Sequence, residues 1–220
     1  LPPPPPPPAL ALWFGVLVKQ PHLPLISLAS AFIWFTALEL GALLFLAWHN
    51  AAYGMVLAVI SQAVARYGAC RLYMWVEGRT NSAFPRSLSD LPCSLAVGFG
   101  FGLPSVLVQS TSVSLTSATS SATYYLAKCP EVSLFAYTAV ISCAMFIFHV
   151  MASLLVLTVG KGCADAAAGA GDAPGGQRRL WAAHGVAAVV HMALSVETHA
   201  TSQVEGGCVT ALVLVLVTTV

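Results

Sequence analysis

Long apolar runs separated by short polar stretches are the main pattern along the chain. A helix needs about 20 residues to cross the hydrocarbon core of a bilayer, where only a backbone that makes its own hydrogen bonds is tolerated. Five runs reach that length, and two shorter ones adjoin the chain ends. The pattern predicts an all-α polytopic membrane protein, a single seven-transmembrane helix bundle over residues 1–220. The expected helices are residues 9–18, 23–48, 51–70, 91–115, 132–160, 180–198 and 206–220.

Charges and helix breakers fall in the stretches between these runs. Two stretches are of low complexity, the Ser/Thr-rich residues 110–123 and the Ala/Gly-rich residues 164–176, and we expect both to be loops. The chain begins at Leu1 instead of Met and ends at Val220 within an apolar run. We therefore expect the first and last helices to be truncated pieces of a longer product.

The composition agrees with a lipid environment. Hydrophobic residues make up 58% of the chain and charged residues 8%, with a mean hydropathy of +0.82. A soluble domain carries about 25% charged residues, so too few are present for a water-soluble surface. This excludes a soluble enzyme, a nucleic-acid-binding protein and a disordered chain. The net charge of +1 indicates no polyanionic partner.

The distribution of lysine and arginine predicts the orientation, because these residues accumulate on the cytoplasmic side. If successive connections alternate between the two sides, one side carries eight of them and the other only Lys128. This places the N-terminus on the lumenal or extracellular side and the C-terminus in the cytosol. Arg66 and Arg71 are expected near the cytoplasmic boundary, with their side chains reaching toward the headgroups. The eight residues are Lys19, Arg66, Arg71, Arg79, Arg86, Lys161, Arg178 and Arg179.

The six cysteines have no CxxC spacing and lie mostly in or beside apolar runs. We interpret them as small buried hydrophobic residues that form neither a disulfide framework nor a zinc site. No motif for a cofactor is present, and we expect none to be bound.

Four polar residues stand in predicted transmembrane helices: Glu39, His149, His184 and His191. A charge at this depth costs at least about 2.5–3.5 kcal/mol, so such residues normally face the bundle interior and find a partner. His184 and His191 are seven residues apart and project from one helix face. They could form a polar contact with another helix, a proton or metal path, or merely hydrogen-bond to neighbouring hydroxyls and carbonyls.

A stripe of small residues opens the fourth predicted helix. Ser94, Gly98 and Gly102 are spaced by four, and the two glycines form a GxxxG motif. Small residues at this spacing let two helix backbones approach closely in a membrane. We therefore expect Ser94, Gly98 and Gly102 to be helix-packing residues.

The sequence contains no HExxH, GxSxG or Walker motif, and no paired intramembrane aspartates. The intramembrane polar residues leave two classes of membrane protein open. A transporter or channel could line its pathway with the intramembrane histidines and Glu39. An integral-membrane metal hydrolase could use His49, His149, His191 and Glu39.

Several short strings, read in order, resemble the anterior-pharynx-defective (Aph) subunit of gamma-secretase. The residues Leu95 to Gly102 resemble its glycine motif, and Phe135 to His149 resemble the run of its fifth helix that ends in a histidine. The remaining strings are Ala31-Phe32-Ile33-Trp34-Phe35, Tyr53-Gly54-Met55 with Arg71 near the end of the same helix, and Arg178-Arg179-Leu180-Trp181 followed by His191. Together they identify the chain as a distant member of the family.

The resemblance implies a non-catalytic scaffold and assembly subunit of an intramembrane aspartyl protease complex. Its partners would be a presenilin-like catalytic subunit, a nicastrin-like glycoprotein and a small fourth subunit, within the lipid bilayer. His149 and His191 would be the polar pair that supports assembly, with Glu39 and Arg71 as further intramembrane polar residues. The location implied is the endoplasmic reticulum, Golgi, endosomal or plasma membrane.

Overall fold

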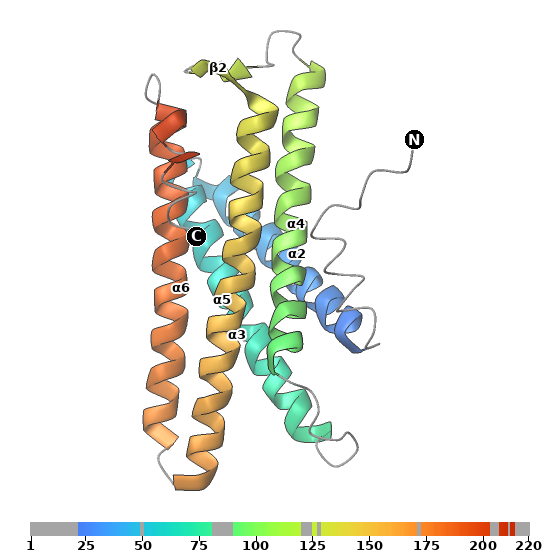
Figure 1. Ribbon diagram of the computed structural model, residues 1–220, viewed down its shortest axis with the longest axis vertical. Coiled ribbons are helices and arrows are strands. Elements are labelled where there is room, and N and C mark those ends of the chain that lie inside the picture. Colours follow the sequence, from blue (N-terminus) through green and yellow to red (C-terminus); the bar gives the residue numbers. More distant parts are fainter. Residues whose placement is uncertain are drawn as a thin grey trace.

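Five long helices make up nearly all of the described part of the chain (Figure 1). The computed structural model describes residues 22–48, 51–80, 90–119, 125–126, 129–170, 173–202, 207–210 and 212–213. The helices are α2 (His22–Trp48), α3 (Ala51–Thr80), α4 (Asp90–Thr119), α5 (Leu134–Ala170) and α6 (Ala173–Ser202), and the strands are β1 (Tyr125–Leu126) and β2 (Cys129–Ser133).

Four of these helices are long and apolar enough to cross a membrane, over residues 22–44, 91–115, 134–159 and 178–198. Large apolar side chains lie exposed on all five helices. Helices that are apolar on all sides belong in lipid or in a large core. The helix α3 is not among the four, since Gln62, Arg66 and Arg71 interrupt its apolar sequence. The predicted helix 9–18 lies outside the described residues, so the seven-helix count stays a prediction.

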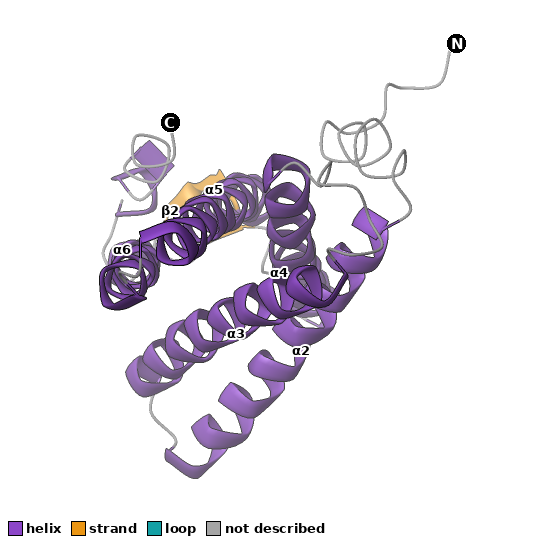
Figure 2. Cartoon of the chain, turned by 90° about the horizontal axis from the view of Figure 1, so that it is seen from below, coloured by secondary structure: helices purple, strands orange, loops and turns teal. Residues whose placement is uncertain are grey.

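The helices pack as a closed ring (Figure 2). The contacts run from α6 to α5, α4, α2 and α3, and α3 returns to α6. Consecutive helices α2 and α3 pack side by side, as do α5 and α6, while α3 crosses the bundle to reach α5. One apolar core runs through the ring with residues from every helix. Its largest fully buried side chains include Phe101 and Val156.

The prediction that residues 110–123 and 164–176 are loops is wrong, because helices continue through much of each stretch. The helix α4 runs to Thr119, so the Ser/Thr-rich stretch is helical over residues 110–119. Its hydroxyls bond back to the preceding turn; Thr111 Oγ1, for example, donates to the carbonyl oxygen of Leu107 at 2.7 Å. The helix α5 extends to Ala170, and α6 already begins at Ala173. Alanine has the highest helix propensity, and this keeps the second stretch helical beyond its apolar run.

A short hairpin departs from the all-α expectation. The strands β1 and β2 pair antiparallel between α4 and α5, with Tyr125 opposite Ser133 and Leu126 opposite Cys129. In Figure 1, β2 caps the end of the bundle where α4 and α6 end and α5 begins. By the predicted orientation this is the lumenal end.

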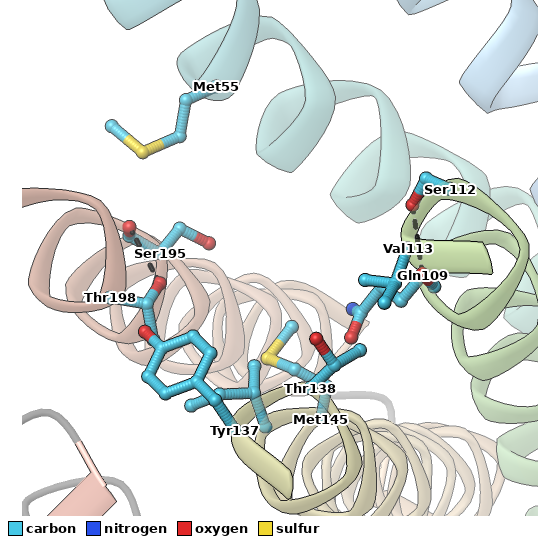
Figure 3. A pocket seen from close by; sticks show the side chains of 10 residues that line it. Met55, Gln109, Ser112, Val113, Tyr137, Thr138, Met145, Ser195 and Thr198 are labelled. Carbon is cyan, nitrogen blue, oxygen red and sulfur yellow. Dashed lines mark hydrogen bonds between the residues drawn. The ribbon is translucent and has the colours of Figure 1, made fainter. Parts of the chain in front are cut away.

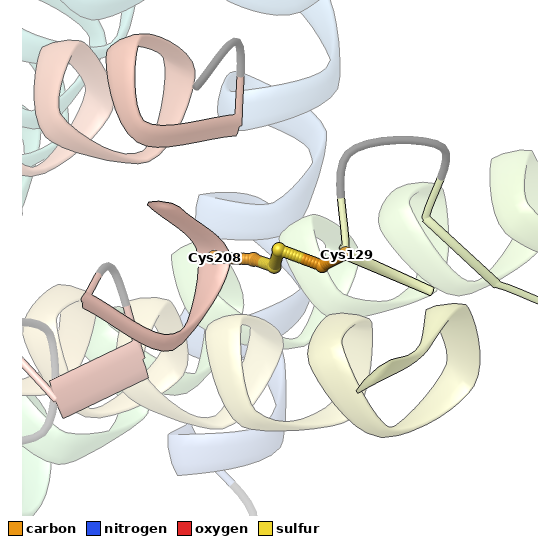
Figure 4. The surroundings of a disulfide bond; sticks show 2 residues. All are labelled: Cys129 and Cys208. Atoms are coloured by element: carbon orange, nitrogen blue, oxygen red, sulfur yellow. A yellow bond between two sulfur atoms is a disulfide. The ribbon is translucent and has the colours of Figure 1, made fainter. Parts of the chain in front are cut away.

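The interpretation of all cysteines as free hydrophobic residues is also wrong. A disulfide joins Cys129, in β2, to Cys208, in the segment after α6 (Figure 4). The two residues are 79 positions apart, with their Cα atoms 6.4 Å from each other. No local pattern in the sequence predicts this pair, because only the return of α6 to the end where α5 begins brings the two cysteines together. Cys70 and Cys93 are buried thiols, as expected, whereas the thiol of Cys143 is exposed.

Removing this disulfide should loosen the end of the bundle that β2 caps. We expect Cys208→Ser to lower the free energy of unfolding by about 2 kcal/mol, the low end of the usual range, because helices held in lipid already restrict the 79-residue loop. Thermal melting of the purified protein in detergent measures this. Cys143→Ser is the matched control and should melt like the wild type. Equal melting of the two variants would show that the bond adds no stability.

Candidate functional site

A polar cluster lies at the centre of the helix ring, formed by Arg66 of α3, His149 of α5 and His191 of α6. All three side chains are buried, and His149 has no exposed surface. The guanidinium of Arg66 lies 2.7 Å from Nδ1 of His149. The imidazole rings of His149 and His191 stand edge to face, with their centroids 5.4 Å apart. The cluster therefore joins α3 to α5 by a hydrogen bond and α5 to α6 by a ring contact.

The hydrogen bond determines the state of His149. A guanidinium can only donate, so Nδ1 of His149 must accept from Nη2 of Arg66. The imidazole is therefore neutral and carries its proton on Nε2. Both Nε2 of His149 and Nδ1 of His191 are buried and have no hydrogen-bond partner among the described residues. The polar groups of this centre are only partly satisfied within the described part of the chain.

Aromatic rings surround the cation. The Arg66 guanidinium carbon lies 5.3 Å from the ring centroid of Phe101 and 5.7 Å from that of Phe148. Phe148 also packs against His191, with centroids 4.9 Å apart. Ring faces attract a cation, so these contacts offset part of its desolvation. Among the residues with described positions, no carboxylate forms an ion pair with Arg66.

The prediction that Arg66 reaches toward the headgroups is wrong. It lies on the buried face of α3 together with Gln62, Ala69 and Cys70. These positions follow the helical spacing of three and four residues, and this spacing is the sequence signal that could have placed Arg66 inside. Arg71 does not join the cluster, because it is exposed on another face of α3.

His184 has a separate contact. It is buried against Tyr67 of α3, with ring centroids 5.2 Å apart. Tyr67 also stacks on Trp181 at 4.7 Å. His184 and His191 lie on one face of α6. His184 faces Tyr67 of α3, and His191 faces His149 of the cluster. The arrangement around His184 is an aromatic packing contact between α3 and α6.

Glu39 does not face the bundle interior, contrary to the expectation. It is exposed on α2. The buried residues Trp34, Ala37 and Gly41 mark the inner face of that helix. Successive residues of a helix are rotated by about 100°. Glu39 is two positions from both Ala37 and Gly41, so it lies on nearly the opposite side of α2 and points away from the bundle. It therefore cannot share a site with the buried histidines.

The small-residue stripe of α4 packs within this chain. A Cβ on Gly98 would lie 2.7 Å from Cα of Val150, and one on Gly102 would lie 2.7 Å from the ring of Phe146, both on α5. Ser94 is fully buried on the same helix. The sequence did not single out Gly100, whose Cβ would lie against backbone and side-chain atoms of α2. Glycines on two sides of α4 thus bring α5 and α2 into close contact with it.

A cavity of about 460 Å³ opens among α3, α4, α5 and α6 (Figure 3). Gln109 projects from α4 into its lining, and its Oε1 accepts a hydrogen bond from Ser142 at 2.7 Å. Met145 and Ser195 also line it, one helical turn from His149 and His191 respectively. The cavity therefore lies next to the polar cluster, toward the end of the bundle that β2 caps.

The arrangement offers little for metal chemistry. Within the described ranges, no group of three His, Cys, Asp or Glu residues is placed to hold a metal ion. Of the proposed hydrolase ligands, His49 lies outside the described residues, and Glu39 faces away from His149 and His191.

Helices with apolar outer faces around a small polar centre define an integral membrane protein of the polytopic helix-bundle class. Comparison with known families specifies it further. The family described as Aph-1 protein matches residues 7–220, which is nearly the whole chain. The chain belongs to the Aph-1 family, and the resemblance seen in the sequence is confirmed. No curated protein matches it.

Proposed function

We propose that this chain is the non-catalytic scaffold subunit of a gamma-secretase complex. In this role it stabilises a presenilin-like catalytic subunit and a nicastrin-like glycoprotein, with a small fourth subunit completing the complex, and so supports intramembrane proteolysis of membrane proteins. Membership of the Aph-1 family supports a gamma-secretase subunit role. The observation that carries the scaffold role is the central cluster of Arg66, His149 and His191, which joins three helices.

The physical reason is the absence of a hydrophobic driving force between helices in lipid. Close packing and buried polar contacts must therefore set the positions of helices. The cluster fixes α3, α5 and α6 relative to one another, and the glycines of α4 fix α2 and α5. A bundle held this firmly presents its outer faces to partner subunits in one arrangement.

The disulfide supports the predicted orientation. Disulfides form in oxidising compartments, on the lumenal or extracellular side of a membrane. Cys129 and Cys208 lie in or after connections that the charge distribution assigns to that side. With Arg66 removed from the count because it is buried, the bias is still seven basic residues against Lys128. We propose a seven-helix chain with its N-terminus lumenal and Arg71 near the cytoplasmic boundary.

The substitution His191→Ala tests the scaffold role. It removes a ring that packs on Phe148 and His149. Because a buried polar contact between membrane helices contributes about 0.6–2 kcal/mol, we expect recovery of the intact complex to fall about 3- to 30-fold. Coprecipitation from native membranes measures this. The control is Val189→Ala, at an exposed apolar position of the same helix, which should leave recovery unchanged.

The same purification separates the alternatives. A scaffold should co-purify with a large lumenal glycoprotein and a protease subunit, whereas a transporter should be stable and active alone. A chain recovered without these partners, or unchanged recovery and proteolysis in His191→Ala, would contradict the proposal. Stoichiometric zinc on the purified chain would favour the metal hydrolase instead.

A further inference from the structure

The outer face of α2 carries a single carboxylate in an apolar stripe. A helix turns by about 100° per residue, so five apolar side chains lie within about 40° of Glu39 in rotation about the axis of α2. All are exposed; Leu28, for example, has 69% of its surface accessible and Phe32 73%. The stripe consists of Leu25, Leu28, Phe32, Phe35, Glu39 and Leu43.

Glu39 lies within the apolar part of this helix. The helix α2 runs to Trp48, so Glu39 is nine residues, or about 14 Å of helix, from the end predicted to be lumenal. A carboxylate facing hydrocarbon at this depth is costly, and such residues are normally paired. No described residue forms an ion pair with Glu39, because the side chain points away from α3 and α4.

The two end segments of the sequence hold little basic charge. Residues 1–21 contain one basic residue, Lys19, and residues 203–220 contain none. Lys19 precedes the start of α2, whereas Glu39 lies 17 residues after His22, about 25 Å along the helix. A basic residue on a neighbouring transmembrane helix would supply the charge complement of Glu39.

We propose that this face of α2 docks a transmembrane helix of another subunit, and that this helix carries a lysine or arginine at the level of Glu39. Apolar residues of the stripe supply the packing contacts, and the ion pair sets the register of the two helices. Glu39 lies toward the lumenal end, so the partner's basic residue lies in the lumenal half of its helix. The inference deepens the proposed scaffold function and rests on it for the existence of partner subunits.

Site-specific photocrosslinking in the intact complex tests this docking face. A photoreactive phenylalanine analogue replaces Phe32, two helical turns from Glu39 on the same stripe. A matched probe replaces Val64, which is exposed to a similar degree, 65%, on α3. After irradiation in native membranes, we expect the Phe32 probe to form an adduct with another subunit and the Val64 probe to give a different pattern.

Substitutions of Glu39 then test the ion pair. We expect Glu39→Gln to reduce the Phe32 adduct about 3- to 30-fold, the effect of losing one polar contact between membrane helices. Glu39→Lys should abolish it, because two like charges would face each other, and Glu39→Asp should retain most of it. Mapping the crosslinked peptide should identify a helix with a basic residue.

Three results would overturn the inference: an adduct only with lipid, an adduct within this chain at residues 1–21 or 203–220, or an adduct that Glu39→Lys leaves unchanged. If presenilin-like and nicastrin-like subunits still co-purify in these cases, the proposed function stands without this docking face. If those subunits are absent but a Glu39-dependent adduct forms with another protein, the docking face stands and the proposed function fails.

Discussion

Replacing His149 by leucine should destabilise the bundle by about 3 kcal/mol or more. The substitution removes the side-chain acceptor of Arg66, whose guanidinium remains buried between Phe101 and Phe148. Removing the neutral acceptor of a buried cation is strongly destabilising, because the guanidinium loses its hydrogen bond and stays desolvated. Thermal unfolding of the purified protein in detergent should show a clear fall in melting temperature, with less protein recovered from membranes.

The double variant Arg66→Met/His149→Leu separates this cause from simple loss of packing. It removes the cation together with its acceptor, and methionine fills much of the arginine stem volume. Replacing both members of a buried pair by apolar residues is often neutral or stabilising, so most of the lost stability should return. The single variant Arg66→Met should cost about 1–3 kcal/mol, because it leaves Nδ1 of His149 without its donor.

If the double variant is as unstable as His149→Leu, the uncompensated charge is not the cause. If it is stable, it provides a folded subunit without the polar cluster. Under the proposed scaffold role, such a subunit should still assemble poorly, because the polar contacts that position α3 and α5 are gone. Coprecipitation of the partner subunits with this variant would measure the role of the cluster in assembly separately from its role in folding.

Replacing Gly100 by alanine should also weaken the bundle, by about 1–3 kcal/mol or more. The new Cβ would lie against the carbonyl oxygen of Ser27 and 2.5 Å from Cβ of Ser30. It would also lie 3.0 Å from the backbone nitrogen of Ala31. Because backbone atoms of α2 have no alternative rotamer that would relieve the clash, α2 and α4 must move apart. This cost exceeds the gain of about 1 kcal/mol that alanine brings to a helix.

Three other glycines are comparison sites for Gly100. Gly185→Ala adds its methyl group where no atom lies within 4 Å, so it should be neutral or slightly stabilising. Gly98→Ala should resemble Gly100→Ala, because it meets Cα of Val150, whereas Gly102→Ala meets a phenylalanine ring that can shift. Melting temperatures of the four variants test this order. Equal values for Gly100→Ala and Gly185→Ala would contradict the tight α2–α4 contact.

Sequence reasoning predicted the features that depend on local composition. Apolar runs of about 20 residues can cross a bilayer only as helices, and the described chain is almost entirely helical. The same reasoning failed where it took polarity as the end of a helix. The hydroxyls of Thr111 and Ser114 bond to carbonyls of their own helix, so a Ser/Thr-rich stretch continues α4. The order of several short strings was sufficient to identify the family.

The site was predicted in part. Polarity alone marked His149 and His191 as residues that need buried partners, and both are buried at the centre of the bundle. It also marked Glu39 as a residue that needs a partner, but this residue lies on the outer face of α2. Arg66 was assigned to the membrane boundary from its position near the predicted end of a helix, yet it forms the centre of the cluster.

The sequence by itself determined which segments form helices and which residues are too polar for lipid, because both depend on the residues' own chemistry. Only the tertiary structure decided which partners those residues find. The approach of α3 to α5 brings Arg66 to His149, and the return of α6 brings Cys208 to Cys129, 79 residues away. Such pairings depend on the positions of whole helices relative to one another, and no local pattern of residues specifies those positions.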